Sequence, residues 1–100
     1  MEIKLAVGKI LRKLRLKAGL TQEQLALDAD IRRTYVSLIE LGQNQPTINT
    51  IFKLARALKI SPSKFIKLVE QETLKEWNFF GAVIVKGLAQ IKNKTQWIIQ

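Results

Sequence analysis

Four side chains within residues 33–38 have the chemistry needed to read the edges of DNA bases. Arg33 can donate two hydrogen bonds to guanine O6 and N7, and Thr34 can touch the methyl group of thymine. Ser37 offers a hydroxyl, while Leu38 can either touch a thymine methyl or pack beneath the loop that follows. Helical spacing places all four on one face, which predicts a surface suited to the major groove.

Polar residues around this face could contact phosphates, which position a protein on DNA without specifying sequence. The first turn of an expected helix at residues 47–49 has free backbone N–H groups, and these favour a bound anion. Tyr35 could donate its hydroxyl to a phosphate or a base edge, or could pack on the preceding helix. The predicted phosphate-binding residues are Gln22, Arg32, Tyr35, Gln43, Asn44, Thr47 and Asn49.

Two short helices joined by a tight turn must hold these side chains. Thr21 can cap the first helix, because its hydroxyl can accept from an early backbone N–H while Gln24 reaches back to the cap residue. Residues 29–31 make the turn, and the second helix runs from about Arg32 to Leu41. Gly42 then ends it, since glycine adopts the left-handed conformation common at helix C-termini.

Three further amphipathic helices are expected around this pair. Apolar residues recur at three- and four-residue steps over residues 3–18 and again over residues 48–58, where Thr47 can cap. Ser61 caps the last helix, with Pro62 at its first position. The buried stripes are expected at Ile3, Val7, Ile10, Leu11, Leu14 and Ala18, then Ile51, Leu54, Ala55 and Leu58, and finally Phe65, Leu68 and Val69. The pattern predicts an all-α fold of five helices.

The order and spacing of these residues resemble the lambda-repressor/Cro-like helix-turn-helix family over roughly residues 5–69. The resemblance implies a five-helix DNA-binding domain within residues 1–69. It also implies that Arg15 pairs with Glu40, the only acid between residues 32 and 69, and so ties the first helix to the recognition helix. The matching residues are Arg15, Gly19, Leu20, Thr21, Gln22, Leu25, Ala26, Ala29, Ile31, Val36, Ser37, Ile39, Glu40, Gly42, Pro46 and the run Ile51–Leu58.

Some positions depart from the family pattern. Asp30 stands where a glycine is common, but aspartate tolerates left-handed dihedrals better than most residues. Arg32 replaces the usual serine or threonine cap of the second helix, which loses a cap worth about 0.5–2 kcal/mol. Asp30 is the alternative cap if that helix starts earlier. Leu38 and Leu41 replace residues that are often polar or basic.

The charge of the chain is strongly positive and unevenly placed. The formal net charge is +9, and residues 1–69 hold 13 of the 17 basic and 5 of the 8 acidic residues. This excess fits a polyanion-binding surface, although a solvated cationic face gives the same total. The chain has neither cysteine nor histidine, no glycine-rich phosphate loop and no paired carboxylates at catalytic spacing. We therefore expect no metal, no cofactor and no enzymatic activity.

Residues 70–100 are expected to form a C-terminal extension. Residues 78–91 fit either an apolar helix face or a short β-hairpin. So much apolar surface should be covered, either by the chain's own domain or, as we favour, by a second copy of the chain. The predicted dimer interface comprises Phe65, Ile66, Val69, Leu74, Trp77, Phe79, Phe80 and Ile84, with Trp97 and Ile98 nearer the end.

The resemblance implies a sequence-specific DNA-binding transcriptional regulator that acts as a homodimer on a roughly palindromic operator. Within the family, the chain most resembles restriction-modification controller proteins and small phage-type repressors. The alternatives are the antitoxin of a toxin–antitoxin pair, with residues 70–100 holding the toxin, and a protein-interaction module without an operator. RNA polymerase is a further expected partner. The N-terminus lacks a signal-peptide pattern and no apolar run approaches the ~20 residues of a membrane span, which favours a cytoplasmic protein. The family resemblance implies that the host is a bacterium or phage.

Overall fold

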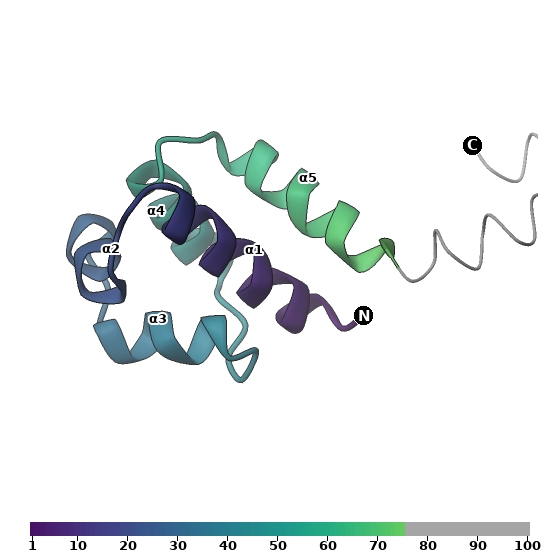
Figure 1. Ribbon diagram of the computed structural model, residues 1–100, viewed down its shortest axis with the longest axis horizontal. Helices are drawn as coiled ribbons and strands as arrows, with labels where there is room; N and C mark the ends of the chain where they lie inside the picture. Colours follow the sequence, from purple (N-terminus) through teal and green to yellow (C-terminus); the bar gives the residue numbers. More distant parts are fainter. Residues whose placement is uncertain (76–100) are drawn as a thin grey trace, which may run out of the picture.

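The computed structural model describes residues 1–75, and these form five α-helices (Figure 1). The helices are α1 (Ile3–Lys17), α2 (Gln22–Ala29), α3 (Arg33–Glu40), α4 (Ile48–Ala57) and α5 (Pro62–Thr73). Each begins and ends within one or two residues of the boundary expected from the sequence, apart from α5, whose end was left open. No helix within residues 1–75 is both long and apolar enough to cross a membrane.

Side-chain caps fix where three of these helices begin. The hydroxyl of Thr21 accepts from the Gln24 backbone N–H at 3.0 Å, and the Gln24 side chain accepts from the Thr21 backbone N–H at 2.9 Å. Thr47 and Ser61 likewise accept from the backbone N–H groups three residues later. These bonds satisfy N–H groups that the first helical turn leaves without a partner, so all three sequence-based cap predictions are confirmed.

The turn between α2 and α3 depends on Asp30. Its φ of 56° and ψ of 49° are left-handed, and its position is the C-cap of α2. The alternative in which Asp30 caps α3 is therefore wrong, because Arg32 occupies that N-cap with extended backbone. Gly42 ends α3 with a φ of 74°, as predicted.

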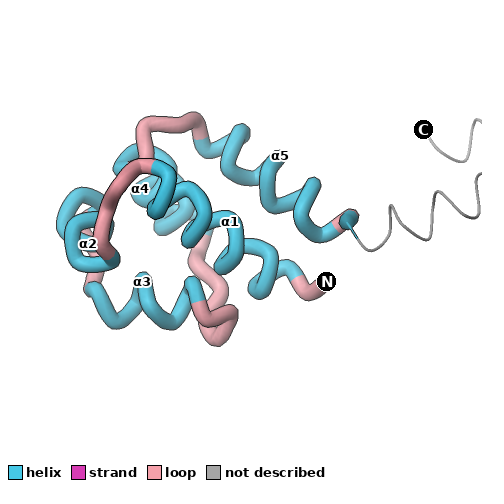
Figure 2. Tube along the Cα trace, viewed as in Figure 1, coloured by secondary structure: helices cyan, strands magenta, loops and turns pink. Residues whose placement is uncertain are grey.

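The main helix contacts close a ring around one core. Helix α1 packs on α3 and α5, α2 packs on α3 and α4, and α4 packs on α5 (Figure 2). The largest fully buried side chains come from all five helices: Leu11, Leu25, Val36, Ile39, Leu54 and Phe65. Because each helix contributes to this shared core, the position of the α2–α3 pair is fixed by the whole ring.

Some predicted core and interface residues lie elsewhere. Ile3 and Ala18 were placed in the buried stripe of α1, but both are exposed, since they lie at the two ends of the helix. Phe65 and Val69 were assigned to a dimer interface as well as to the core; the structure buries both within the core of a single chain. Of the predicted interface, Ile66 and Leu74 remain exposed. The other predicted interface residues, Trp77, Phe79, Phe80 and Ile84, lie outside the described residues, as do Trp97, Ile98 and the choice between helix and hairpin.

Gly8 sets the distance between α1 and α3. A Cβ atom at this position would lie 2.7 Å from the backbone carbonyl oxygen of Glu40 and closer still to that of Ile39. Real Cβ atoms do not approach backbone oxygen so closely. The two helices therefore touch backbone to backbone at this crossing, which only glycine permits.

Gly8→Ala should destabilise the fold although alanine is the better helix former. The new methyl group must push α1 away from α3, and such overpacking typically costs about 1–3 kcal/mol. Alanine recovers up to about 1 kcal/mol of helix propensity, so urea denaturation should show a net loss. Lys9→Ala, at the exposed neighbouring position, is the control and should stay within about 0.5 kcal/mol. Equal stability of the two variants would contradict the close approach.

Candidate nucleic-acid interface

A buried ion pair joins α1 to the end of α3. Arg15 Nε donates to Glu40 Oε2 at 2.6 Å, and Arg15 Nη2 donates to Glu40 Oε1 at 3.0 Å. The remaining nitrogen, Nη1, donates to the Leu20 carbonyl oxygen at 2.9 Å. The two side chains are only 9% and 3% exposed. The hydrogen bond to Glu40 raises the pKa of Arg15 against the opposing effect of burial, so the guanidinium remains charged. The predicted Arg15–Glu40 pair is confirmed.

Gln22 extends this connection to α2. Its side-chain Nε2 donates to Glu40 Oε1 at 3.1 Å, so one carboxylate accepts hydrogen bonds from α1 and α2 while it belongs to α3. Sequence reasoning missed this bond and assigned Gln22 to phosphate binding. The signal was present, because Gln22 begins the helix beside the turn and Glu40 is the only acid available between residues 32 and 69.

The outer face of α3 carries the predicted base-reading residues. Arg33 and Thr34 are exposed, Ser37 and Leu38 are partly exposed, and Val36 and Ile39 point into the core. The structure thus places Arg33, Thr34, Ser37 and Leu38 on the helix side away from its packing. The surface includes Arg33, the first residue of α3. Side chains near the start of a recognition helix commonly meet base edges.

Leu38 also organises the loop after α3. Its carbonyl oxygen accepts from the backbone N–H groups of Gln43 and Asn44 at 3.0 and 3.3 Å. The Gln43 and Asn44 side chains are exposed. The loop is therefore held by its backbone, which leaves both polar side chains available for contacts beyond the protein.

The other predicted phosphate-binding residues fall into two groups. Arg32 and Asn49 are exposed, at the N-cap of α3 and in the first turn of α4. Thr47 and Tyr35 are already engaged. The Thr47 hydroxyl accepts from the Thr50 N–H and donates to the Thr50 hydroxyl oxygen at 3.1 Å, while Tyr35 packs against the core. Any anion at α4 would therefore meet backbone N–H groups and Asn49 more directly than the Thr47 side chain.

Arg33 and Gln22 are brought together at one concavity. A hollow of about 590 Å³ between the α1–α2 turn and the start of α3 is lined by both residues, together with Arg15 and Glu23. The structure therefore places the strongest candidate for base recognition beside the residue that reaches the Arg15–Glu40 pair.

A helix-turn-helix family model matches residues 11–65, and the chain belongs to this family. The sequence-based assignment to helix-turn-helix transcriptional regulators is thereby confirmed.

The similar proteins include several controller proteins. Control protein C.BamHI of Bacillus amyloliquefaciens is 37% identical over 65 residues, which cover 64% of this chain and 80% of the relative. Control protein C.MunI of a Mycoplasma species is 36% identical over 72 residues, which cover 71% of this chain and 97% of the relative. The restriction-modification controller protein C.Esp1396I, a tetramer with its natural 35 base-pair operator, superposes with a TM-score of 0.69 at 32% identity, covering 75% of this chain and 99% of that one.

Glu40→Leu should be strongly destabilising. It leaves the buried guanidinium of Arg15 without its partner, which typically costs about 3–5 kcal/mol. Arg15→Leu/Glu40→Leu removes both charges and should recover much of that loss, because an apolar pair needs no partner in a buried site. Urea denaturation of both variants and the parent chain measures the difference. A double variant less stable than Glu40→Leu alone would contradict this account.

Proposed function

We propose that the chain binds a roughly palindromic operator as a homodimer, as a transcriptional regulator of the restriction-modification controller type. The observation that carries the proposal is the outer face of α3, where exposed Arg33 and Thr34 stand on a helix held at its other end by Glu40. The excess of basic residues within residues 1–69 also supports DNA binding, because phosphate contacts need cations.

The two kinds of DNA contact are divided between two regions. Base reading is assigned to α3 through Arg33, Thr34, Ser37 and Leu38. Phosphate contacts are assigned to Arg32, the loop at Gln43 and Asn44, and the start of α4 at Thr47 and Asn49, with Tyr35 at the margin. Gln22 acts through Glu40, because its amide donates to that carboxylate and so helps to set the position of α3.

Arg33→Ala should lose discrimination at one base pair in each operator half-site, by about 1–3 kcal/mol, because it removes a bidentate contact with guanine. An operator would first be selected from a random library, and binding then measured by anisotropy for single-base variants. Gln22→Ala should weaken binding to all sequences more evenly.

The matched control for Arg33→Ala is Arg56→Ala, which removes the same charge from an exposed position on α4. It should leave base preference unchanged.

For the parent chain, log K for random duplex should fall against log salt with a slope of roughly −5 to −9 if about 6–10 phosphates are neutralised per dimer. A flat salt titration, or an Arg33→Ala chain with unaltered base preference, would overturn the assignment.

The two-fold interface is assigned to an apolar face formed where the N-terminal ends of α1 and α4 meet α5. Ile3, Ile48 and Ile66 are 57%, 67% and 43% exposed there, around a hollow of about 480 Å³ whose floor includes Val7 and Ile51. A second copy of the chain would cover this face. It would also pair two recognition helices, and an operator read by two helices requires half-sites about 34 Å apart.

Ile66→Glu should convert the dimer to a monomer, because it places a charge in the middle of the apolar face. Sedimentation at micromolar concentration should show the change, and affinity for the selected operator should fall by at least about tenfold since paired binding is lost. Ile66 is exposed, so the helical signal of the folded chain should be retained. Lys67→Glu, at the next exposed position, is the control and should remain dimeric. A dimeric Ile66→Glu chain would refute this interface.

The extension beyond the domain is assigned to strengthening the dimer. Helix α5 continues to Thr73, so the first residues of the proposed extension, which comprises residues 70–100, belong to this helix. A regulator of this kind acts by occluding or recruiting RNA polymerase. A toxin bound by residues 70–100 is the competing role, and co-purification of a second polypeptide would distinguish it.

A further inference from the structure

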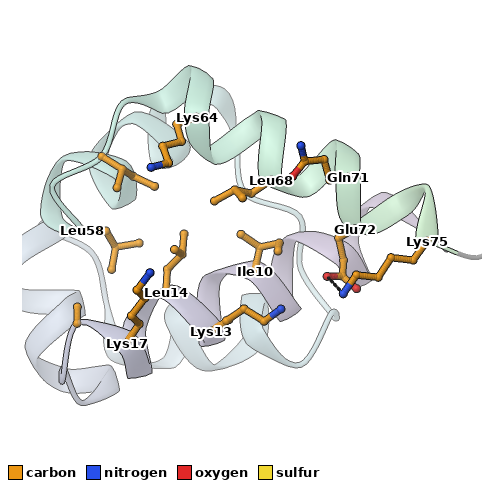
Figure 3. A pocket seen from close by; sticks show the side chains of 12 residues that line it. Ile10, Lys13, Leu14, Lys17, Leu58, Lys64, Leu68, Gln71, Glu72 and Lys75 are labelled. Atoms are coloured by element: carbon orange, nitrogen blue, oxygen red, sulfur yellow. Dashed lines mark ion pairs between the residues drawn. The ribbon is translucent and has the colours of Figure 1, made fainter. Parts of the chain in front are cut away.

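A groove lined with lysines runs between α1 and α5, apart from the predicted DNA-binding and dimer surfaces. Its floor is apolar, with Ile10, Leu14, Leu58 and Leu68 facing a space of about 600 Å³ (Figure 3). This volume is within the range of ordinary binding sites, which span roughly 300–1,000 Å³. Ile10 and Leu58 are nearly buried, whereas Leu14 and Leu68 are partly exposed and would favour an occupant with an apolar side of its own.

The rim of the groove is positively charged. Among the described residues that line it, Lys13, Lys17, Lys64 and Lys75 are basic and Glu72 is the single acid. Glu72 is 5% exposed, and its Oε1 lies 3.1 Å from Lys75 Nζ. The carboxylate is thus paired within the rim, and the remaining lysines favour an occupant that carries negative charge.

The lysines are spread along the groove and do not converge on one point. Figure 3 shows Lys17 and Lys64 toward one end, Lys13 along the α1 edge and Lys75 at the other end. Along α1 alone, the stretch from Ile10 to Lys17 covers about 10 Å at 1.5 Å per residue. One anionic head group would need converging cations. Charges distributed in this way suit several carboxylates spaced along a polymer.

The groove lies on the side of α1 opposite α3. Lys17 follows Gly8 by nine positions in α1, and each position turns the helix by about 100°. Lys17 therefore lies roughly half a turn around the helix from Gly8, which touches the α3 backbone. An occupant of the groove would therefore be separated from the base-reading face by the thickness of α1. Duplex DNA lying against α3 would not cover it.

We propose that this lysine-rimmed groove binds an acidic amphipathic helix of a partner protein. The apolar side of such a helix would lie on Leu14 and Leu68, and carboxylates flanking that side would pair with Lys13, Lys17 and Lys64. Helix-in-groove recognition uses anchors at three- and four-residue spacing with flanking charges, which this arrangement of floor and rim matches. The chain could then hold a protein partner while α3 lies on DNA.

The test uses a fluorescent helical peptide of about 18 residues with leucines at three- and four-residue spacing and glutamates on both flanks. Its binding to the full chain is measured by anisotropy, beside a peptide with the same leucines and lysine flanks. Lys13→Glu/Lys17→Glu is the groove variant. Lys53→Glu/Arg56→Glu on α4 has the same change in charge outside the groove and is the control.

We expect micromolar binding of the acidic peptide, a loss of at least about tenfold in the groove variant, and a loss under about threefold in the control. Leu68→Ala should also weaken binding of the acidic peptide, while the helical signal of the chain is retained. Equal losses in the two charge variants, or equal binding of the lysine-flanked peptide, would overturn the proposal. Failure of the acidic peptide to bind the full chain would also overturn it.

Two further probes separate other anions from a protein helix. Phosphatidylglycerol vesicles and a random DNA duplex are titrated against the same three chains. The proposal expects the groove variant and the control to respond alike to each of these probes. Vesicle or duplex binding that is lost selectively in the groove variant would assign the groove to lipid or nucleic acid and overturn the proposal.

Discussion

The Glu40 carboxylate is the interaction on which the candidate interface depends. It lies at the end of α3, accepts two hydrogen bonds from Arg15 of α1 and accepts a third from Gln22 of α2. Arg15 in turn holds the Leu20 carbonyl at the turn into α2. Three helices are therefore aligned through one buried anion. Since a buried pair contributes more to geometry than to stability, its value lies in fixing the angle at which α3 projects.

Local chemistry explains why much of this fold could be predicted. The caps at Thr21, Thr47 and Ser61 act within a few residues, so their sequence patterns were sufficient. The left-handed Asp30 was also readable, because few residue types tolerate that conformation. The Arg15–Glu40 pair was implied by family resemblance and supported by the lack of another acid nearby.

The features that were missed all depend on tertiary packing. Gly8 looks like an ordinary helix interior glycine, and only the arrival of α3 backbone carbonyls explains it. Periodicity placed Ile3 in the buried stripe of α1 without showing that this stripe stops short of the helix end, where the residue is exposed. The hydrogen bond from Gln22 to Glu40 was missed although its partner could be found in the sequence, because an amide suits a phosphate or a carboxylate equally well.

The backbone contact at Gly8 has a consequence for how such a protein can diversify. The placement of α3 is set by its inner side chains, by Glu40 and by the touching backbones, and Arg33 and Thr34 on its outer side are exposed. Exposed positions can change at little cost in folding free energy. With base reading assigned to Arg33 and Thr34 as proposed, structure and specificity would be encoded by separate sets of residues in one short helix. A lineage carrying this scaffold could acquire new target sequences by single substitutions, without first evolving compensating stability.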